Sequence, residues 1–247
     1  LVVIMSLIPN NTDASTIKVL LGKEGVEPTK VEALISKAIK HGLILHISET
    51  GMYAFAHDKI REASFIIIPN GRARDELLVR ISHALIDMHI STCIKKNSDW
   101  MLFVAIDHMN SVSPELEPRM DVARWNLRVA RMKISKGATK SANLNVNAAL
   151  AALEDSGEKW NEYKFTLSLM NELIALEFMV GNFDTAFVYI EDVLGNATTL
   201  KDKSVAYLHR IKTFAEGENR DYIHGVVEGI KILELYGVSL SNPPSRM

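Results

Sequence analysis

The fold of this chain is limited most strongly by a short turn between two helix-forming stretches. Apolar side chains recur at helical spacing from Tyr163 and stop at Gly181, and a second helical stretch runs from Asp184 to about Leu194. The turn reads Gly181-Asn182-Phe183-Asp184-Thr185-Ala186. Glycine permits a tight turn, the aromatic ring can fill the seam between helices, and alanine lets two backbones approach closely. The segment therefore predicts two closely packed antiparallel helices.

A second break, Gly217-Glu218-Asn219-Arg220-Asp221, lies 36 residues after Gly181 and precedes a predicted helix over residues 222–236. This interval is close to the period of about 34 residues in tetratricopeptide repeats, and the first turn is similar to their mid-repeat turn. Gly225 stands near the place where alanine is expected, so the second copy is degenerate. We expect residues 119–240 to form antiparallel helical hairpins in a tetratricopeptide-like right-handed array. A generic bundle of antiparallel helices is the alternative.

The first third of the chain has a different pattern. A helix over residues 16–21 can be capped by Asp13 or Ser15 and stops at Gly22, and a second helix begins at Pro28 and ends at Gly42. The apolar face of the second helix consists of Val31, Leu34, Ile35, Ala38 and Ile39. Two β-prone runs, 43–47 and 52–56, surround a glycine-bearing turn, and a helix over 57–67 is closed by Pro69. The order helix, helix, hairpin predicts a winged-helix-like lobe over residues 13–69.

The remaining segments are predicted from their composition and from the positions of helix-breaking residues. Residues 70–118 are predicted to be connecting helices, over 72–91 and 100–109, closed by a loop at 111–118 that holds Pro114 and Pro118. The apolar stretch 1–12 is interpreted as the tail of a preceding segment, and 241–247 as a linker. The fold class is thus mainly α, with a small hairpin-bearing lobe.

The charge balance argues against nucleic acid as a partner. The chain carries 28 Lys and Arg against 30 Asp and Glu, and residues 13–62 contain seven basic and seven acidic side chains. Duplex binding needs a surplus of cations that neutralises phosphates. A packing module is therefore preferred, while a DNA-binding regulator with a helical effector domain stays open as the alternative. One cysteine, Cys93, suits a reducing compartment, and no apolar run is long enough to span a membrane.

Motifs that carry chemistry are missing from the sequence. There is no phosphate-binding G-x-x-x-x-G-K-[ST], no G-x-G-x-x-G, no G-x-S-x-G and no H-E-x-x-H. We therefore expect no catalytic residues, no metal site and no bound cofactor in this chain. Gly181, Phe183 and Ala186 are expected to serve only in packing of the repeat turn.

One string carries a family resemblance. Residues 53–69 read YAFAHDKIREASFIIIP, which resembles the segment after the AAA/STAND-type ATPase module of multidomain hybrid serine/threonine kinase–histidine kinase signalling proteins. Asp107-His108-Met109-Asn110 and the run from Ala123 to Ala130 resemble further elements of that family, and residues 233–241 resemble the end of its helical region. None of the family's catalytic parts lies in this chain.

The resemblance implies a non-catalytic regulatory segment in the cytoplasm. ATP and Mg²⁺ would bind an upstream ATPase, and the partners would be the protein's own ATPase and kinase domains and a protein on the array surface. His57 and Asp58 then have two roles open to them. They can act as sensors of the bound nucleotide, or Asp58 can cap the helix while His57 is a partly buried hydrogen-bonding side chain. A metal or hydrolytic pair would need further ligands that the sequence lacks.

Overall fold

The computed structural model describes residues 1–91, 98–217 and 221–240. Contacts divide the chain into two compact units, one from Leu1 to Pro118 and one from Arg119 onward. The described residues are mainly helical and include a small antiparallel sheet of three strands. Cys93, the break residues 218–220 and the predicted linker 241–247 lie outside the described residues.

Unit 1 combines the sheet with short and long helices. Its elements are α1 (Val2–Ser6), β1 (Thr12–Asp13), α2 (Ala14–Lys23), α3 (Pro28–Lys40), β2 (Ile44–Ile47), β3 (Met52–Phe55), α4 (Asp58–Ile66), α5 (Arg72–Ser91), α6 (Asp99–Ser111) and the 3-10 turn η1 (Pro114–Leu116).

The hairpin of β2 and β3 forms as the sequence predicts, and β1 joins it. The strand order is β1–β3–β2, all antiparallel, with Ile44 opposite Phe55 and Thr12 opposite Tyr53. No local sequence pattern predicts β1, because a strand of two residues is defined only by its pairing with β3, which lies far along the chain. The side chain of Asn10 accepts a hydrogen bond from the N–H of Phe55 at 2.9 Å and holds the incoming chain at the sheet.

Residues 1–12 pack within this unit. Helix α1 packs against α4 and α2. Ile4, Met5, Leu7 and Ile8 are buried, and β1 pairs with the hairpin. The start of the chain therefore supplies core side chains to the lobe.

Helices α2 and α3 differ from prediction in extent and in exposed surface. Asp13 caps α2 by accepting from the N–H of Thr16 at 3.0 Å, and the helix continues through Gly22 to Lys23. Helix α3 begins at Pro28 as expected. It buries Val31, Ile35 and Ala38 but leaves Leu34 and Ile39 exposed, because it packs mainly against α2 and β2.

Helices α5 and α6 form the other half of unit 1. They pack against each other along their length, and the Oγ of Ser82 donates to the C=O of Ala105 across the contact at 3.0 Å. Helix α2 also packs against α5 and joins the two halves. The predicted helix over 72–91 has these bounds in the structure.

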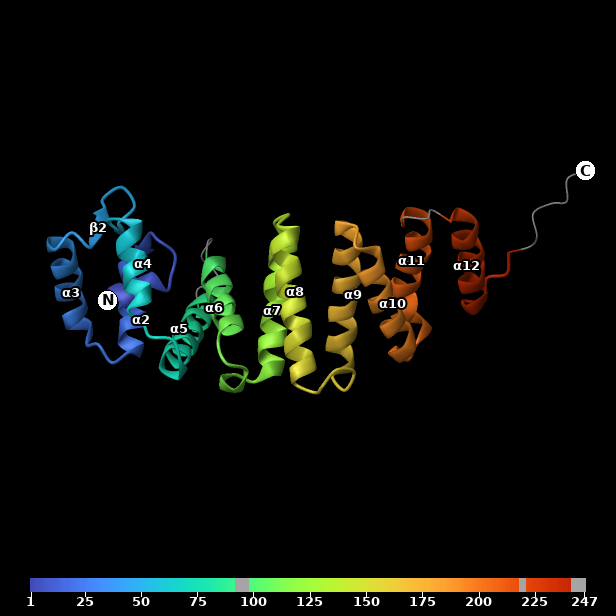
Figure 1. Cartoon of the computed structure of the whole chain (residues 1–247), viewed down its shortest axis with the longest axis horizontal. Coiled ribbons are helices and arrows are strands. Elements are labelled where there is room, and N and C mark those ends of the chain that lie inside the picture. The colour runs from blue at the N-terminus through green and yellow to red at the C-terminus, as the bar shows by residue number, and fades with distance from the viewer. Residues whose placement is uncertain (92–97, 218–220, 241–247) are drawn as a thin grey trace, which may run out of the picture. The chain divides into compact units, whose positions relative to one another are not determined.

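Unit 2 consists of helices that follow one another in chain order (Figure 1). They are α7 (Arg119–Ser135), α8 (Thr139–Asp155), α9 (Tyr163–Val180), α10 (Phe183–Asn196), α11 (Leu200–Glu216) and α12 (Tyr222–Leu235). Each packs against the next, and α9 also packs against α11. The core runs through α7 to α11 and is rich in small residues, of which Ala142, Ala149 and Ala186 are fully buried.

Four helices of unit 2 start in the same way. The residues before α8, α9, α10 and α12 are Ala138, Glu162, Asn182 and Asp221, with φ between −87° and −80° and ψ between 57° and 78°. In each helix, the N–H of the fourth residue after this position bonds to the C=O of the same position. Those fourth residues are all buried: Ala142, Thr166, Ala186 and Gly225. A small side chain at this place lets the start of each helix approach its neighbour, so the unit repeats one local structure.

Candidate functional site

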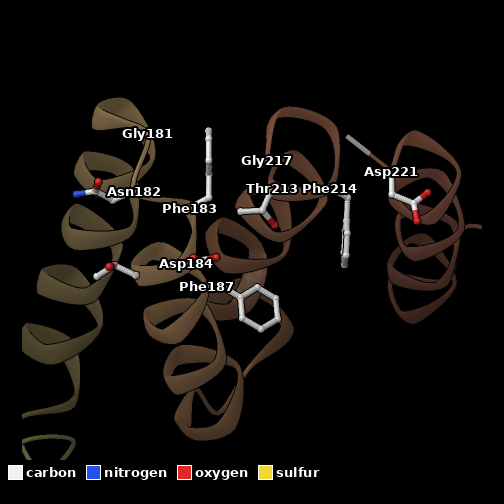
Figure 2. Close-up of a pocket in the computed structure, with 10 residues that line it drawn as sticks. Gly181, Asn182, Phe183, Asp184, Phe187, Thr213, Phe214, Gly217 and Asp221 are labelled. Atoms are coloured by element: carbon white, nitrogen blue, oxygen red, sulfur yellow. The ribbon is translucent and has the colours of Figure 1, made fainter. Parts of the chain in front are cut away.

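The candidate site is a hollow of about 480 Å³ in unit 2, which we call the turn hollow. Figure 2 shows it at the first turn of α10, the last turn of α11 and the start of α12. Its described lining residues are Gly181, Asn182, Phe183, Asp184, Thr185, Phe187, Thr213, Phe214, Gly217 and Asp221.

One wall of the turn hollow is the turn that the sequence analysis singled out. Gly181 has a φ of +83°, a conformation that favours glycine, and the N–H of Asn182 bonds to the C=O of Glu177 at 2.9 Å. Phe183 lies with its edge against Phe178, their ring centres 5.1 Å apart. Ala186 is fully buried behind this wall. Gly181 thus forms the turn, Phe183 lies in the seam between helices, and Ala186 lies at the helix contact.

A buried carboxylate supports this turn, and sequence reasoning missed it. Glu177 is 4% exposed, and its two side-chain oxygens accept from the side-chain amides of Asn143 at 3.2 Å and Asn182 at 2.7 Å. Buried carboxylates need such donors, because desolvation otherwise disfavours the charge. Glu177 therefore links α8 to the turn before α10. A lone glutamate in an apolar helix gives no sign of these partners.

The turn hollow combines aromatic rings with carboxylates. Asp184, Phe183 and Phe187 lie on one side of the last turn of α11, and Phe214 and Asp221 lie on the other (Figure 2). The Asp221 side chain accepts from the N–H of His224 at 2.9 Å. The ring of Phe214 stacks on that of His224, with centres 4.3 Å apart.

The cationic groups near the turn hollow have other partners. The guanidinium of Arg210 forms ion pairs with Glu191 at 3.0 Å and with Glu228 at 3.2 Å, and it lies 6.0 Å from the ring centre of Phe187. The Nζ of Lys212 lies 5.8 Å from the ring centre of Phe178. Burial lowers the pKa of His209, with the charge of Lys212 acting in the same direction. Among the charged side chains that the structure describes in the lining, both are acidic.

A second hollow, of about 460 Å³, lies in unit 1. It is lined by the loop from Ser6 to Asn10, by Arg61 and Phe65 of α4, and by Val104, Asp107 and His108 of α6. The structure therefore brings together the two strings on which the resemblance of unit 1 depends, residues 53–69 and 107–110.

His108 is held in this region as a neutral ring. Its pKa falls to about 4, first because of burial and also because of the charge on Arg74, while a hydrogen bond to the backbone of Leu7 opposes the shift. Its Nδ1 atom is buried without a hydrogen-bond partner among the described residues. The sequence alone does not distinguish this histidine from the exposed ones.

The cap of α4 is His57 and not Asp58, which corrects the structural alternative drawn from the sequence. His57 is exposed and caps α4, since its Nδ1 accepts from the N–H of Lys59 at 3.1 Å, and Asp58 is the exposed first residue of the helix. The extended backbone of His57, with φ −155° and ψ 144°, turns its ring back toward the helix start. Asp58 lines a hollow that shares Ser6, Arg61 and Phe65 with the one just described.

Two further observations concern metals and membranes. Within residues 1–91, 98–217 and 221–240, no three histidine, cysteine, aspartate or glutamate side chains group in a way that could hold a metal ion. Among the described helices, none combines the length and hydropathy that a bilayer crossing requires.

No protein-family model and no curated protein matches the chain. Among solved structures, the chain is similar to a Signal Transduction ATPase with Numerous Domains (STAND) protein with a tetratricopeptide repeat sensor from Pyrococcus horikoshii. The identity is 16% and the TM-score is 0.38. The match covers 96% of this chain and 38% of that one, so this chain spans well under half the length of the protein that it matches. A likeness of this size assigns neither a family nor an activity.

Proposed function

We propose that this chain is a non-catalytic regulatory and protein-interaction segment, in which a small lobe is joined to a helical-repeat scaffold. The observation that carries the proposal is the repeated helix start of unit 2, with one backbone conformation before four helices and a buried residue four positions later. Stacked helical units of this kind extend a binding surface without forming a catalytic centre. We infer that the array is tetratricopeptide-like and right-handed.

The finer assignment of unit 1 is a winged helix. Its support is the order α1, β1, α2, α3, β2, β3, together with the sheet order β1–β3–β2. In this proposal, the lobe packs on an upstream STAND ATPase that binds ATP and Mg²⁺, and kinase domains of the same protein are further partners. Support for the ATPase and the kinases comes from the sequence resemblance alone. A cytoplasmic location is likewise an inference from the sequence.

His57 is the residue through which the lobe would report the nucleotide state. Its ring is exposed, and its Nδ1 is engaged by the N–H of Lys59, which leaves Nε2 as the atom for a ligand. Asp58 beside it is also exposed. The pair would act as a sensor and not as a catalyst.

The proposal is tested first on the isolated chain. Purified residues 1–247 should hydrolyse no ATP, and the sequence upstream should contain a G-x-x-x-x-G-K-[ST] motif. ATP turnover by the isolated chain, or an upstream region without such a motif, would contradict the proposal.

The second test uses the ATPase module joined to this chain. His57→Ala should change the rate of ATP hydrolysis or the affinity for ADP, whereas the exposed His41→Ala serves as the matched control. Equal effects of the two substitutions would remove His57 from the sensing role. Thermal unfolding of both variants would check that the cap of α4 has not been lost.

A further inference from the structure

The turn hollow has the chemistry of a site for basic side chains. We propose that it binds an extended segment of a partner protein that carries lysine or arginine, an inference that rests on the interaction function proposed above. The site lies at the ends of α10, α11 and α12, and its volume of about 480 Å³ is in the range of ligand sites, roughly 300–1,000 Å³.

Charge is the first argument for a cationic occupant. Asp184 and Asp221 are the charged side chains of the described lining, and Figure 2 shows them on opposite sides of the last turn of α11. Both are exposed. Nearby Arg210 is already paired with Glu191 and Glu228, so it does not neutralise them. The Nδ1 of His224 lies 4.0 Å from a carboxylate oxygen of Asp221 and adds a positive charge only when that ring is protonated. An occupant with separated positive charges would meet one carboxylate on each side.

The aromatic rings are the second argument. Phe183, Phe187 and Phe214 line the turn hollow together with the two carboxylates. Phe187 is 38% exposed, so part of its surface is open to an occupant. Ring faces attract lysine and arginine, and their apolar stems pack well against rings. Carboxylates beside aromatic rings therefore suit both the charge and the stem of a basic side chain.

The competing occupant is an anion, because helix starts attract negative charge. At α12 the side chain of Asp221 already accepts from the N–H of His224. At α10 the carboxylate of Asp184 stands in the first helical turn and opposes an incoming anion. Local charge therefore favours a cation over a phosphate or an acidic peptide.

The experiment titrates the full chain with three capped peptides of equal length. In each peptide alanine alternates with one other residue, which is lysine, glutamate or norleucine. Backbone amide NMR shifts give both the affinity and the place of binding. We expect the lysine peptide to shift the amides of Thr213, Gly217 and Asp184, and to bind more weakly as NaCl rises from about 50 to about 500 mM. The glutamate and norleucine peptides should leave these amides unchanged.

Three substitutions separate the site from general charge attraction. Asp184→Asn and Asp221→Asn each remove one charge, and asparagine at 221 keeps a side chain that can cap α12. Each should weaken the lysine peptide about three-fold, and the double variant about ten-fold. Glu234→Gln removes an equal charge from the exposed far end of α12 and should change the affinity by less than about 1.5-fold.

The outcomes are distinct. Glutamate-peptide binding at these amides, lysine-peptide binding that survives the double variant, or no shift up to millimolar peptide would each overturn the inference. If the lysine peptide fails to bind while the ATPase module still binds the original chain, the basic-segment site is wrong and the interaction function stands. If neither the original nor the variant binds that module, the proposed function itself fails.

Discussion

His108 shows how a single residue couples unit 1 to pH. Its pKa of about 4 in the folded state lies below the ordinary 6.5. The unfolded chain therefore takes up a proton on this ring as pH falls through 6.5, while the folded chain does not until about pH 4. The contribution of His108 to stability is complete above pH 6.5 and is lost progressively down to about pH 4, by up to about 3 kcal/mol.

Replacement of His108 by glutamine should flatten this dependence. Urea unfolding of unit 1, followed at several pH values from 7.5 to 4, measures the slope. His41→Gln, on an exposed histidine of the same unit, is the control and should keep the slope of the original chain. An unchanged slope in the His108 variant would show that other groups carry the pH dependence.

Two glycines of α12 should respond to alanine in opposite ways. A Cβ at Gly229 would meet Ile211 at 3.7 Å, an ordinary contact, so Gly229→Ala should stabilise unit 2 by about 0.5–1 kcal/mol through helix propensity. A Cβ at Gly225 would lie 3.3 Å from the Cβ of Phe214, an atom fixed to its backbone. Gly225→Ala should therefore gain nothing or destabilise the unit. Thermal unfolding of the two alanine variants measures these changes in stability. An equal gain in stability at both positions would show that α12 can shift on α11 to accept the added methyl group.

At the scale of elements, α7 and α8 are registered by buried amides. The side-chain amide of Asn145 donates to the side-chain oxygen of Asn126 at 2.9 Å, and its own oxygen accepts from Lys133 at 2.7 Å. Both asparagines are buried. Asn145→Leu removes the donor that Asn126 faces, so we expect a loss of about 1–3 kcal/mol in the free energy of unfolding.

A double-mutant cycle tests this pairing. The loss in Asn126→Leu with Asn145→Leu should be smaller than the sum of the single losses, since both amides are then gone. Chemical denaturation of the four proteins measures the coupling. Additive losses would show that the two amides act independently.

The elements differ in how far the sequence predicts them. Helices α3 and α5 follow from apolar spacing and from Pro28, which are local signals. The strand β1 and the burial of Ile4 and Ile8 depend on pairing across the lobe, which no local pattern encodes. The same holds for the lining of the turn hollow. The turn at Gly181 can be predicted from the sequence, whereas Thr213 and Phe214 line the hollow only because α11 packs against α10.

On the scale of the whole molecule, the charge balance argues against the DNA-binding alternative and leads to a prediction. The net charge is −2, and basic side chains of the lobe are paired, Lys18 with Glu32 at 2.7 Å and Lys59 with Glu62 at 2.8 Å. We expect the full chain to retard duplex DNA weakly or not at all in a gel at about 150 mM salt. Tight, salt-sensitive retardation would restore the DNA-binding alternative.

Each helix of unit 2 packs mainly against the helices before and after it in the chain. The free energy of local unfolding can therefore differ from one helix to the next. Helix α9 buries seven residues, whereas α11 buries Ala206 alone and α12 only Gly225 and Ile232. Amide hydrogens should accordingly exchange slowest in α8 and α9 and fastest in α12. Uniform protection would contradict this gradient. The turn hollow includes the start of α12. A bound peptide should therefore slow amide exchange in α12 first, so that partner binding would suppress local unfolding at this end of unit 2.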